Sequence, residues 1–281
     1  MSAPHRRRAA RRLPARVLWH ARGLLALLPT ALLSVALLSV PGAAHAADYV
    51  QLPAGTLTSV LASDADKGPL PVAAFAMRVT PVTQGEYLRF VGAHPAWRRD
   101  RIARTFADTG YLRDWRAPLE LPEPAAQRRP VTNVSWFAAQ AYCEAEGARL
   151  PTWTEWEYAA AADATRRDAR ADPAWRARIL AWYSRPADTA LPDVGGAPDV
   201  YGVRDLHSLI WEWVDDFNAL LVSPDSRAGD DPDKLKFCGA GAINLKDREN
   251  YAVLMRIALL SSLNASDSTS SLGFRCVRPL P

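Results

Sequence analysis

Hydrophobic and polar positions follow two different periods along the chain, and the change of period predicts where a strand gives way to a helix. The segment FAMRVTPVTQGEYLRFV, residues 75–91, begins as an apolar extended run and continues with Tyr87 and Phe90 at helical spacing. Between them, Thr83 and Glu86 have the spacing of a capping box, in which a hydroxyl and a carboxylate satisfy free N–H groups at a helix start. A strand followed by a helix is therefore expected here.

Two further helices are predicted by the same kinds of signal. NVSWFAAQAYCEAEG is expected to start a helix at Ser135 and to end it at Gly147, because glycine accepts the left-handed conformation found just after helices. LPTWTEWEYAAAAD carries a second capping box, formed by Thr152 and Glu155. The next stretch, residues 164–183, is charged and helix-prone, and we interpret it as a surface insertion.

The remaining segments are short and irregular. Residues 95–131 are rich in arginine, proline and tryptophan, and from about Leu191 turns alternate with short apolar segments such as IWEWVDDF and GFRCVR. Helices come before short strands, no alternating strand–helix–strand pattern is seen, and no internal repeat divides the chain. The pattern predicts a single α+β domain with much irregular structure.

The first 46 residues differ from the rest in charge and apolar content. Seven arginines and no acidic residue precede or flank the apolar run LLALLPTALLSVALLSV, which is followed by the small-x-small sequence AHA. This order is typical of a secretory signal peptide. The alternative is a membrane anchor, but a run of about 17 residues interrupted by Pro29 is shorter than the roughly 20 that span a bilayer.

We therefore expect residues 1–46 to be a signal peptide and residues 47–281 to form the folded domain. The domain would be periplasmic or secreted, without membrane association once the signal is removed, and such a compartment permits disulfides. The strong excess of arginine over lysine is typical of a GC-rich bacterial genome and favours the periplasm.

Removing the signal changes the net charge. The whole chain carries 34 basic and 30 acidic residues, and residues 1–46 hold seven of the basic and none of the acidic ones, which leaves 27 against 30. The formal charge falls from +4 to −3, so the domain is slightly acidic. A nucleic-acid partner is not expected, because its electrostatic basis is lost.

Residues 47–281 contain few side chains that bind transition metals. Their histidines and cysteines are His94, His207, Cys143, Cys238 and Cys276, and no CxxC, HExxH or methionine-rich tract is present. A three-histidine iron site cannot be built from a single copy of this chain. Metal chemistry would have to use a thiolate, or carboxylates for a hard cation.

Several motifs, taken in order, resemble one family. TPVTQGEYLRFV, PVTNVSWFAAQAYCEAEGARLPTWTEWEYAAAA, VYGVRDLHSLIWEWVDDF and LGFRCVR are similar to segments of the formylglycine-generating enzyme family, also called sulfatase-modifying factors. The resemblance covers nearly all of the domain and implies a single C-type-lectin-like α+β fold. The family includes copper-dependent oxidases that convert a substrate cysteine to formylglycine, iron-dependent sulfoxide synthases, siderophore-maturation oxidases and members without assigned chemistry. Membership alone therefore does not give a reaction.

The resemblance also implies roles for the cysteines. Cys143 and Cys276 occupy the positions of a disulfide in the vertebrate oxidase, and we expect them to pair. The oxidase's reactive cysteine pair would fall between residues 239 and 275, where this chain has no cysteine and the best register places Asp247 and Ala252. Copper(I) held by two thiolates cannot form there. Neither a copper cofactor nor formylglycine generation is therefore expected.

Cys238 is then the spare cysteine and the remaining catalytic candidate. It would act as a relocated thiolate, as a one-cysteine copper ligand, or as a site of intermolecular pairing. The alternative is a buried, inert thiol beside the Gly-Ala-Gly-Ala turn, and we favour it because only Lys234 and Lys236 supply positive charge nearby in the sequence.

Calcium is the metal that the resemblance does imply. Relatives bind one calcium around the segment equivalent to RDLHSLIWEW, which here gives Asp205 and Glu212 through side chains, and Ser208 and Ile210 through main-chain carbonyls. Leu209 replaces the usual asparagine. The alternative is that Glu212 pairs with an arginine.

Further expectations concern the positions of the tryptophans and of His207. Trp97 and Trp115 lie in irregular segments and are candidates for the wall of a groove. His207, within a family motif, is expected to be packed or hydrogen-bonded rather than a ligand. The tryptophans of the family motifs are expected in the core: Trp136, Trp153, Trp156, Trp211 and Trp213.

Three functions remain open from the sequence. The first is an accessory, maturation or protein-binding factor for a periplasmic enzyme, for example a copper enzyme, with a protein or peptide as partner. The second is an oxidase with altered chemistry, as in the siderophore-maturation branch. The third is formylglycine generation on a sulfatase cysteine. Loss of both thiolates and the scarcity of histidine favour the first.

Overall fold

The computed structural model describes residues 48–59, 68–185, 190–219 and 251–280. All of them belong to the second of the two units into which the chain divides, Ala46–Pro281. Cys238 lies outside the described residues, and so does Asp247. Within the described part of the chain, no helix is both long enough and apolar enough to cross a membrane.

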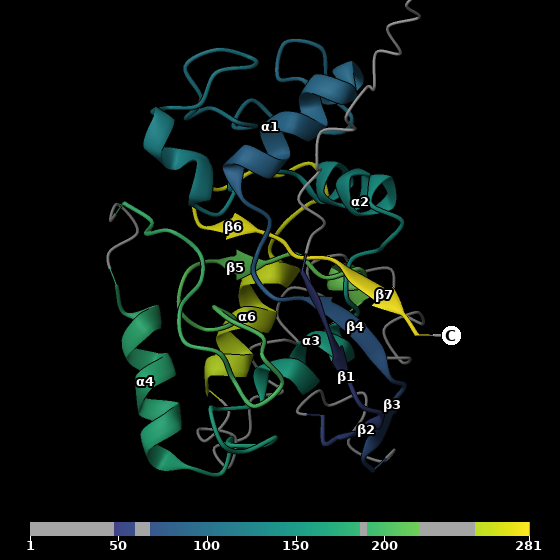
Figure 1. Cartoon of the computed structure of the whole chain (residues 1–281), viewed down its shortest axis with the longest axis vertical. Coiled ribbons are helices and arrows are strands. Elements are labelled where there is room, and N and C mark those ends of the chain that lie inside the picture. The colour runs from purple at the N-terminus through teal and green to yellow at the C-terminus, as the bar shows by residue number, and fades with distance from the viewer. Residues whose placement is uncertain (1–47, 60–67, 186–189, 220–250, 281) are drawn as a thin grey trace, which may run out of the picture. The chain divides into compact units, whose positions relative to one another are not determined.

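Three small sheets organise the strands (Figure 1). The largest is antiparallel and has the order β1–β4–β7, from β1 (Tyr49–Leu52), β4 (Phe75–Arg78) and β7 (Val277–Pro279). Strands β2 (Gly55–Leu57) and β3 (Leu70–Val72) form an antiparallel pair, and β5 (Trp211–Glu212) and β6 (Leu272–Gly273) form a parallel pair. The first sheet therefore joins the start of the domain to its end.

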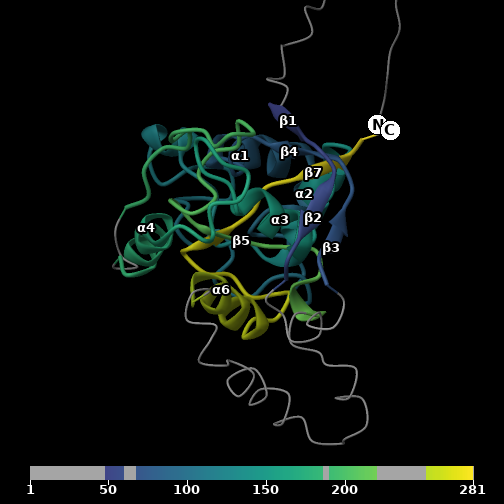
Figure 2. The same cartoon turned by 90° about the horizontal axis from the view of Figure 1, so that it is seen from below.

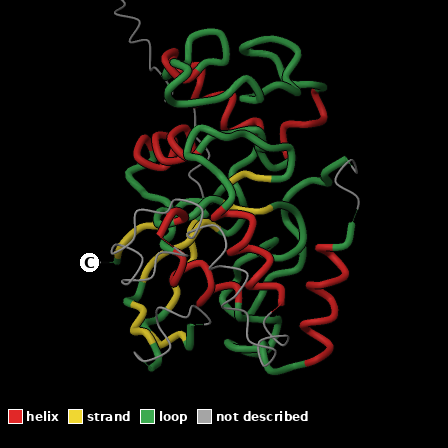
Figure 3. The backbone as a smooth tube through the Cα atoms, turned by 180° about the vertical axis from the view of Figure 1, so that it is seen from behind, coloured by secondary structure: helices red, strands yellow, loops and turns green. Residues whose placement is uncertain are grey.

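The helices are short and are separated by long loops, which make up much of the described backbone in Figure 3. They are α1 (Gln84–Ala93), α2 (Trp136–Ala145), α3 (Trp153–Ala160), α4 (Pro173–Tyr183) and α6 (Tyr251–Ser261). Single 3₁₀ turns occur at Pro95–Trp97, Pro124–Arg128 and Phe217–Ala219. The predicted α+β domain with much irregular structure is confirmed.

The predicted helix starts are confirmed as well. At α1 the Thr83 hydroxyl accepts a hydrogen bond from the Glu86 N–H at 3.3 Å, and the Glu86 carboxylate accepts one from the Thr83 N–H at 2.8 Å. Thr152 and Glu155 form the same box at α3. Ser135 caps α2 through its side chain. Each cap satisfies N–H groups that have no partner within the helix, and so fixes where the helix begins.

Every described segment contributes residues to the hydrophobic core. Trp115 is also a core residue, although it was not expected there. Tyr87 and Phe90 are buried on the predicted face of α1. Trp115 is only 5% exposed, and its ring packs edge-on against Tyr87 at 6.4 Å, so the prediction that it lines a groove is wrong. An irregular backbone still buries a large apolar ring when its neighbours are aromatic. Trp97 is half-buried.

Gly273 in β6 lies where two backbone segments approach closely. A Cβ at this position would lie 2.2 Å from the carbonyl oxygen of Val131 and 2.7 Å from Cδ1 of Ile210. We expect G273A to lower the free energy of unfolding by about 1–3 kcal/mol, because the backbone of one segment has to move. Urea denaturation measures the change. The control is G92A on α1, where a Cβ meets nothing within 4 Å; equal effects of the two substitutions would contradict the prediction.

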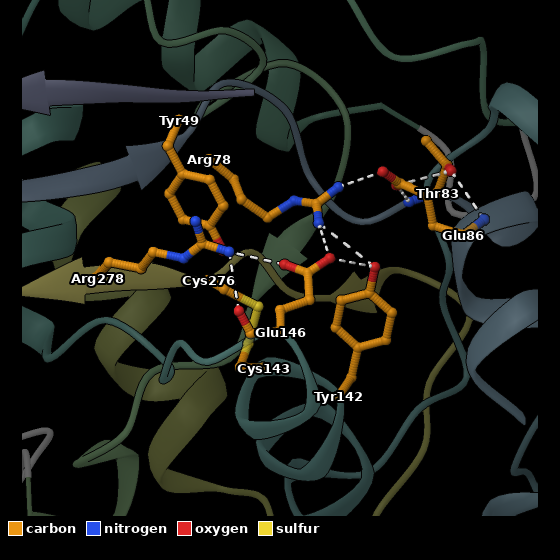
Figure 4. A network of polar contacts seen from close by, with 9 residues as sticks. All are labelled: Tyr49, Arg78, Thr83, Glu86, Tyr142, Cys143, Glu146, Cys276 and Arg278. Carbon is orange, nitrogen blue, oxygen red and sulfur yellow. Dashed lines mark hydrogen bonds and ion pairs between the residues drawn. A yellow bond between two sulfur atoms is a disulfide. The ribbon is translucent and has the colours of Figure 1, made fainter. Parts of the chain in front are cut away.

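A buried polar network holds the first sheet against α1 and α2 (Figure 4). Arg78, at the end of β4 and 2% exposed, forms ion pairs with Glu86 and, at 2.5 Å, with Glu146. The hydroxyls of Tyr49 and Tyr142 donate to the Glu146 carboxylate at 3.0 and 2.8 Å. One guanidinium therefore connects β4 with two helices and, through Glu146, with β1.

Because Glu86 belongs to this network, the free energy of unfolding depends on pH through the ionisation of its carboxylate. Burial acts to raise the pKa of Glu86, but the charge of Arg78 and the hydrogen bonds from Thr83 outweigh burial and lower this pKa below its ordinary value of 4.5. As pH falls, the unfolded chain therefore takes up the proton first. The stabilisation from ionised Glu86 is complete above pH 4.5 and is lost as the pH falls through the pKa of the folded state.

We accordingly expect the difference in free energy of unfolding between the wild type and E86Q to shrink as the pH falls from 7 to about 3. Urea denaturation at a series of pH values measures it. A difference that stays constant over this range would contradict the prediction, because it would show that folding does not lower the pKa of Glu86.

Candidate functional site: a cleft beside helix α4

The two described cysteines are joined to each other. Cys143 on α2 and Cys276, directly before β7, form a disulfide with Cα atoms 5.5 Å apart, and both are 0% exposed. They are the pair that the resemblance indicated. Neither of these two thiols is therefore available for chemistry, and Cys238 lies outside the described residues.

The predicted calcium residues have other partners. Glu212 is 0% exposed, and its two carboxylate oxygens accept hydrogen bonds from Arg275 at 2.7 and 2.8 Å. Trp156 Nε1 also donates to it at 2.8 Å. The Asp205 carboxylate accepts from the N–H groups of Gly195 and Gly196 at 2.7 and 2.9 Å.

This donor set does not fit a calcium ion as it stands. A cation bound to Glu212 would lie beside the buried positive charge of Arg275, which repels it. The geometry favours the alternative in which Glu212 pairs with an arginine. Ser208 is exposed and Ile210 is buried. Elsewhere, the described residues contain no group of three or more His, Cys, Asp or Glu side chains arranged to hold a metal. Calcium binding stays a prediction, which calorimetric titration of the wild type and E212Q would test.

A cleft of about 380 Å³ lies between α4 and the loop of residues 197–208, and we call it the α4 cleft. Figures 1 and 2 show α4 at the edge of the domain, with loops on its inner side. Trp175, Ile179 and Trp182 line one wall, and the loop contributes Asp199 and His207 to the other. A concave site with aromatic walls and a few polar groups is typical of ligand-binding pockets.

Local sequence explains why α4 forms this wall. Asp172 caps the helix by accepting from the Ala174 N–H at 2.8 Å, and Pro173 occupies the first turn, where its missing N–H costs nothing. Trp175, Ile179 and Trp182 follow at intervals of four and three residues, which place them on one face. Trp175 and Ile179 are buried, so the predicted surface insertion has one inward face.

His207 lies in the opposite wall, between two tryptophans. Its ring meets those of Trp156 and Trp175 edge-on, with centroids 5.5 Å apart in both cases. Nε2 lies 2.8 Å from the carbonyl oxygen of Ala160, which can only accept, so Nε2 carries the proton and Nδ1 has a free lone pair. Nδ1 is buried and has no partner among the described residues.

Burial keeps this ring neutral. Burial lowers the pKa of His207 to about 4 and outweighs the hydrogen bond to Ala160; the charge of Arg275 lowers the pKa further. The expectation that His207 is packed and hydrogen-bonded agrees with this geometry. Its free Nδ1 acceptor, however, was not foreseen.

Asp199 supplies a second unpartnered acceptor in the same wall. Its Oδ1 accepts from the N–H groups of Tyr201 and Val203 at 2.8 and 2.9 Å, whereas Oδ2 is buried without a partner among the described residues. Burial raises the pKa of Asp199, and the hydrogen bonds to its backbone neighbours counteract this only in part.

The loop that carries Asp199 and His207 has one residue in an unusual backbone conformation and is held in place by hydrogen bonds. Asp205 has φ of +67°, a conformation that non-glycine residues rarely adopt. Its carboxylate binds the Gly195 and Gly196 N–H groups, and a Cβ on Gly196 would lie 2.6 Å from Oδ1 of Asp205. A side chain at position 196 would therefore displace the Asp205 carboxylate from the two N–H groups that it accepts from.

The α4 cleft was not predicted from the sequence. A groove was expected at Trp97 and Trp115, and Trp175 and Trp182 were not among the candidate site residues. The signal that could have found them is the spacing of apolar residues at 175, 179 and 182 in an otherwise charged segment.

The fold and the buried disulfide define the class of protein: an α+β domain of small sheets and short helices, joined by long loops and closed by a disulfide. Comparison with known families identifies the family within this class. Residues 37–280 match the family described as the Sulfatase-modifying factor enzyme 1-like domain, and the chain belongs to that family. The resemblance seen in the sequence motifs is thereby confirmed.

Several relatives carry the name formylglycine-generating enzyme. The protein from Mycobacterium tuberculosis is 28% identical over 290 residues, covering 82% of this chain and 97% of its own length. The protein from Streptomyces coelicolor is 32% identical over 183 residues, 58% of this chain and 57% of its own length. The chain thus spans little more than half the length of the Streptomyces relative, and 48% of the mouse formylglycine-generating enzyme.

Similarity also extends to differently named proteins. A hercynine oxygenase from Mycolicibacterium smegmatis is 35% identical over 97 residues, which is 30% of this chain and 21% of that protein. Among solved structures, PvdO from Pseudomonas aeruginosa is 19% identical with a TM-score of 0.42, covering 83% of this chain and 94% of PvdO. CarF is 18% identical with a TM-score of 0.42, covering 84% and 99%.

Proposed function

We propose that this chain is a binding member of its family that holds a peptide segment of a protein partner in the α4 cleft. In this proposal it acts in the periplasm as an accessory or maturation factor for another enzyme. The observation that carries the proposal is the α4 cleft itself, with tryptophans on one wall and the polar residues Asp199 and His207 on the other. Pockets that bury a ligand combine apolar walls with a few polar groups in this way.

The cysteine inventory supports binding over oxidation. Cys143 and Cys276 are consumed by the disulfide. The sequence between residues 239 and 275 offers no cysteine at all, so the two-thiolate copper route of the family's oxidases has no ligands there.

An oxidase with altered chemistry is the second candidate, favoured by the similarity to a hercynine oxygenase. Oxygen uptake by the purified mature chain, supplied with copper(I) or iron(II), separates the two candidates. Uptake that requires the metal and is lost on Cys238→Ser would support the oxidase. We expect no metal-dependent uptake.

A peptide array tests the binding function directly. We expect the mature chain to bind a subset of immobilised peptides, and the soluble form of those peptides to change its tryptophan fluorescence. Trp182→Ala should weaken binding about tenfold, because an aromatic wall is removed. Phe106→Ala, which removes an exposed aromatic ring that does not line the cleft, is the matched control. Equal binding by all three proteins would contradict the proposal.

A further inference from the structure

The wall of the α4 cleft that α4 provides carries positive charge as well as aromatic rings. Two tryptophans and two arginines line the cleft at intervals of three, four and three residues: Trp175, Arg178, Trp182 and Arg185. This spacing places side chains on one face of a helix. Arg185 comes just after α4, where its N–H donates to the carbonyl oxygen of Trp182 at 3.1 Å, so the chain still turns as a helix there.

The two arginines are the charged groups at the cleft that a ligand reaches from solvent. The side chains of Arg178 and Arg185 are exposed, and within the described residues neither guanidinium has an ion-pair or hydrogen-bond partner. Residues 173–185, PAWRARILAWYSR, contain no Asp or Glu that could neutralise them from the same helix. Both guanidinium groups therefore keep their full capacity to bind a carboxylate.

Three carboxylates also line the cleft, and all three are engaged within the protein. Asp163 forms an ion pair with Arg166. Asp205 is only 7% exposed and accepts from two backbone N–H groups. Asp199 also accepts from two backbone N–H groups, its other oxygen is buried, and the positive charge of Arg275 acts on it. A ligand thus meets unpaired positive charge at the rim, whereas the negative charges are buried or already paired.

We infer that the α4 cleft recognises an acidic peptide segment, whose carboxylates bind Arg178 and Arg185 while an apolar side chain lies against Trp182. This inference rests on the proposed peptide-binding function and specifies the kind of peptide that is bound. The carboxylates belong to Asp or Glu side chains or to a free carboxyl terminus, because a guanidinium binds either with two parallel hydrogen bonds. Tryptophan and arginine are also the residues that contribute most to protein–protein contacts.

The spacing of the arginines sets the spacing of the acidic groups. Seven residues of helix rise about 10 Å along the axis. About three residues of an extended peptide cover the same length. Two acidic residues three positions apart, with apolar residues between them, therefore match the two arginines and the intervening Trp182.

An array of peptides in matched sets tests the inference with the mature chain. Each set keeps one sequence of apolar and small residues and places glutamate, glutamine or lysine at two positions three residues apart, with both termini capped. A fourth version keeps glutamine and has a free carboxyl terminus. We expect at least one of the two acidic versions to bind about tenfold more tightly than the capped glutamine version, measured by tryptophan fluorescence with the soluble peptides.

The lysine version controls for non-specific attraction. Residues 47–281 are slightly acidic overall, so the net charge of the domain favours lysine peptides. A preference for glutamate runs against this net charge and therefore reports a local site. The acidic version that binds best identifies the side chains or the carboxyl terminus as the source of the carboxylates.

Variants assign the preference to α4. R178Q/R185Q should reduce the preference for the acidic versions about tenfold, and both positions are exposed, so the variant should fold. R178K/R185K keeps the charges but not the planar guanidinium, and should retain part of the preference. R101Q/R104Q is the matched control: it removes two exposed arginines that do not line the cleft, with the same change in net charge, and should leave the preference unchanged.

The possible failures are distinguishable. Equal binding of the acidic and capped glutamine versions, or tighter binding of the lysine version, would overturn the inference but leave the peptide-binding function standing. A preference for acidic peptides that survives R178Q/R185Q, or that R101Q/R104Q abolishes, would also overturn it, since another site would be responsible. An array on which no version of any set binds would overturn both the inference and the proposed function.

Discussion

C143A/C276A is expected to lower the free energy of unfolding by as much as about 5 kcal/mol, because the disulfide closes a loop of 133 residues and restricts the unfolded chain. A domain of this size is stable by only about 5–15 kcal/mol, so much of its stability depends on this one bond. The disulfide also lies beside the Arg78–Glu146 network, as Figure 4 shows. Urea denaturation of the oxidised wild type and of the double variant measures the difference.

Substitution is a better test than a reducing agent, since both sulfur-bearing residues are 0% exposed and a reductant would reach them only after unfolding. C238A, which removes a cysteine but keeps the disulfide, is the control. If the double variant and C238A unfolded at the same urea concentration, the chain-entropy account of the disulfide would be wrong for this protein. A wild type that yields three free thiols after denaturation without reductant would show that the bond does not form.

Local sequence signals predicted much of the fold. Thr83 with Glu86, and Thr152 with Glu155, mark helix starts because the partners lie three residues apart and no distant contact is needed. The same holds for Ser135 at the start of α2. The pairing of Cys143 with Cys276 required more than local pattern, since three cysteines permit three pairings; the family resemblance indicated the pair that the structure joins.

The residues of the candidate site could not be predicted from local patterns, because contacts between distant segments bring them together. Trp115 was expected in a groove because its segment is irregular, yet Tyr87 from helix α1 packs against it. Trp175 and His207 meet across 32 positions of sequence, so neither segment alone indicates a cleft. Glu212 and Arg275 lie in two separate motifs, and the pairing of β5 with β6 brings those motifs side by side.

The buried Glu212–Arg275 pair gives the second large effect. Both residues are 0% exposed, and Arg275 donates to both carboxylate oxygens of Glu212 and to the carbonyl oxygens of Arg78, Val79 and Arg204. R275M is expected to lower the free energy of unfolding by about 3–5 kcal/mol, because it leaves a carboxylate charge buried and unpaired. Urea denaturation of the wild type and the variant measures the loss.

The double variant R275M/E212Q separates the loss of the charge pair from the loss of packing. Glutamine can still accept the hydrogen bond from Trp156 and carries no charge, so the double variant should be more stable than R275M alone. R113M is the control, because Arg113 is 56% exposed at its side chain and pairs with Asp114 at 3.8 Å; such a surface pair contributes about 0–1 kcal/mol. If R275M were no less stable than R113M, Glu212 would have another partner, and calcium would be the first to test. In that case added calcium should raise the midpoint of R275M but not that of R275M/E212Q, since only the former keeps the carboxylate charge.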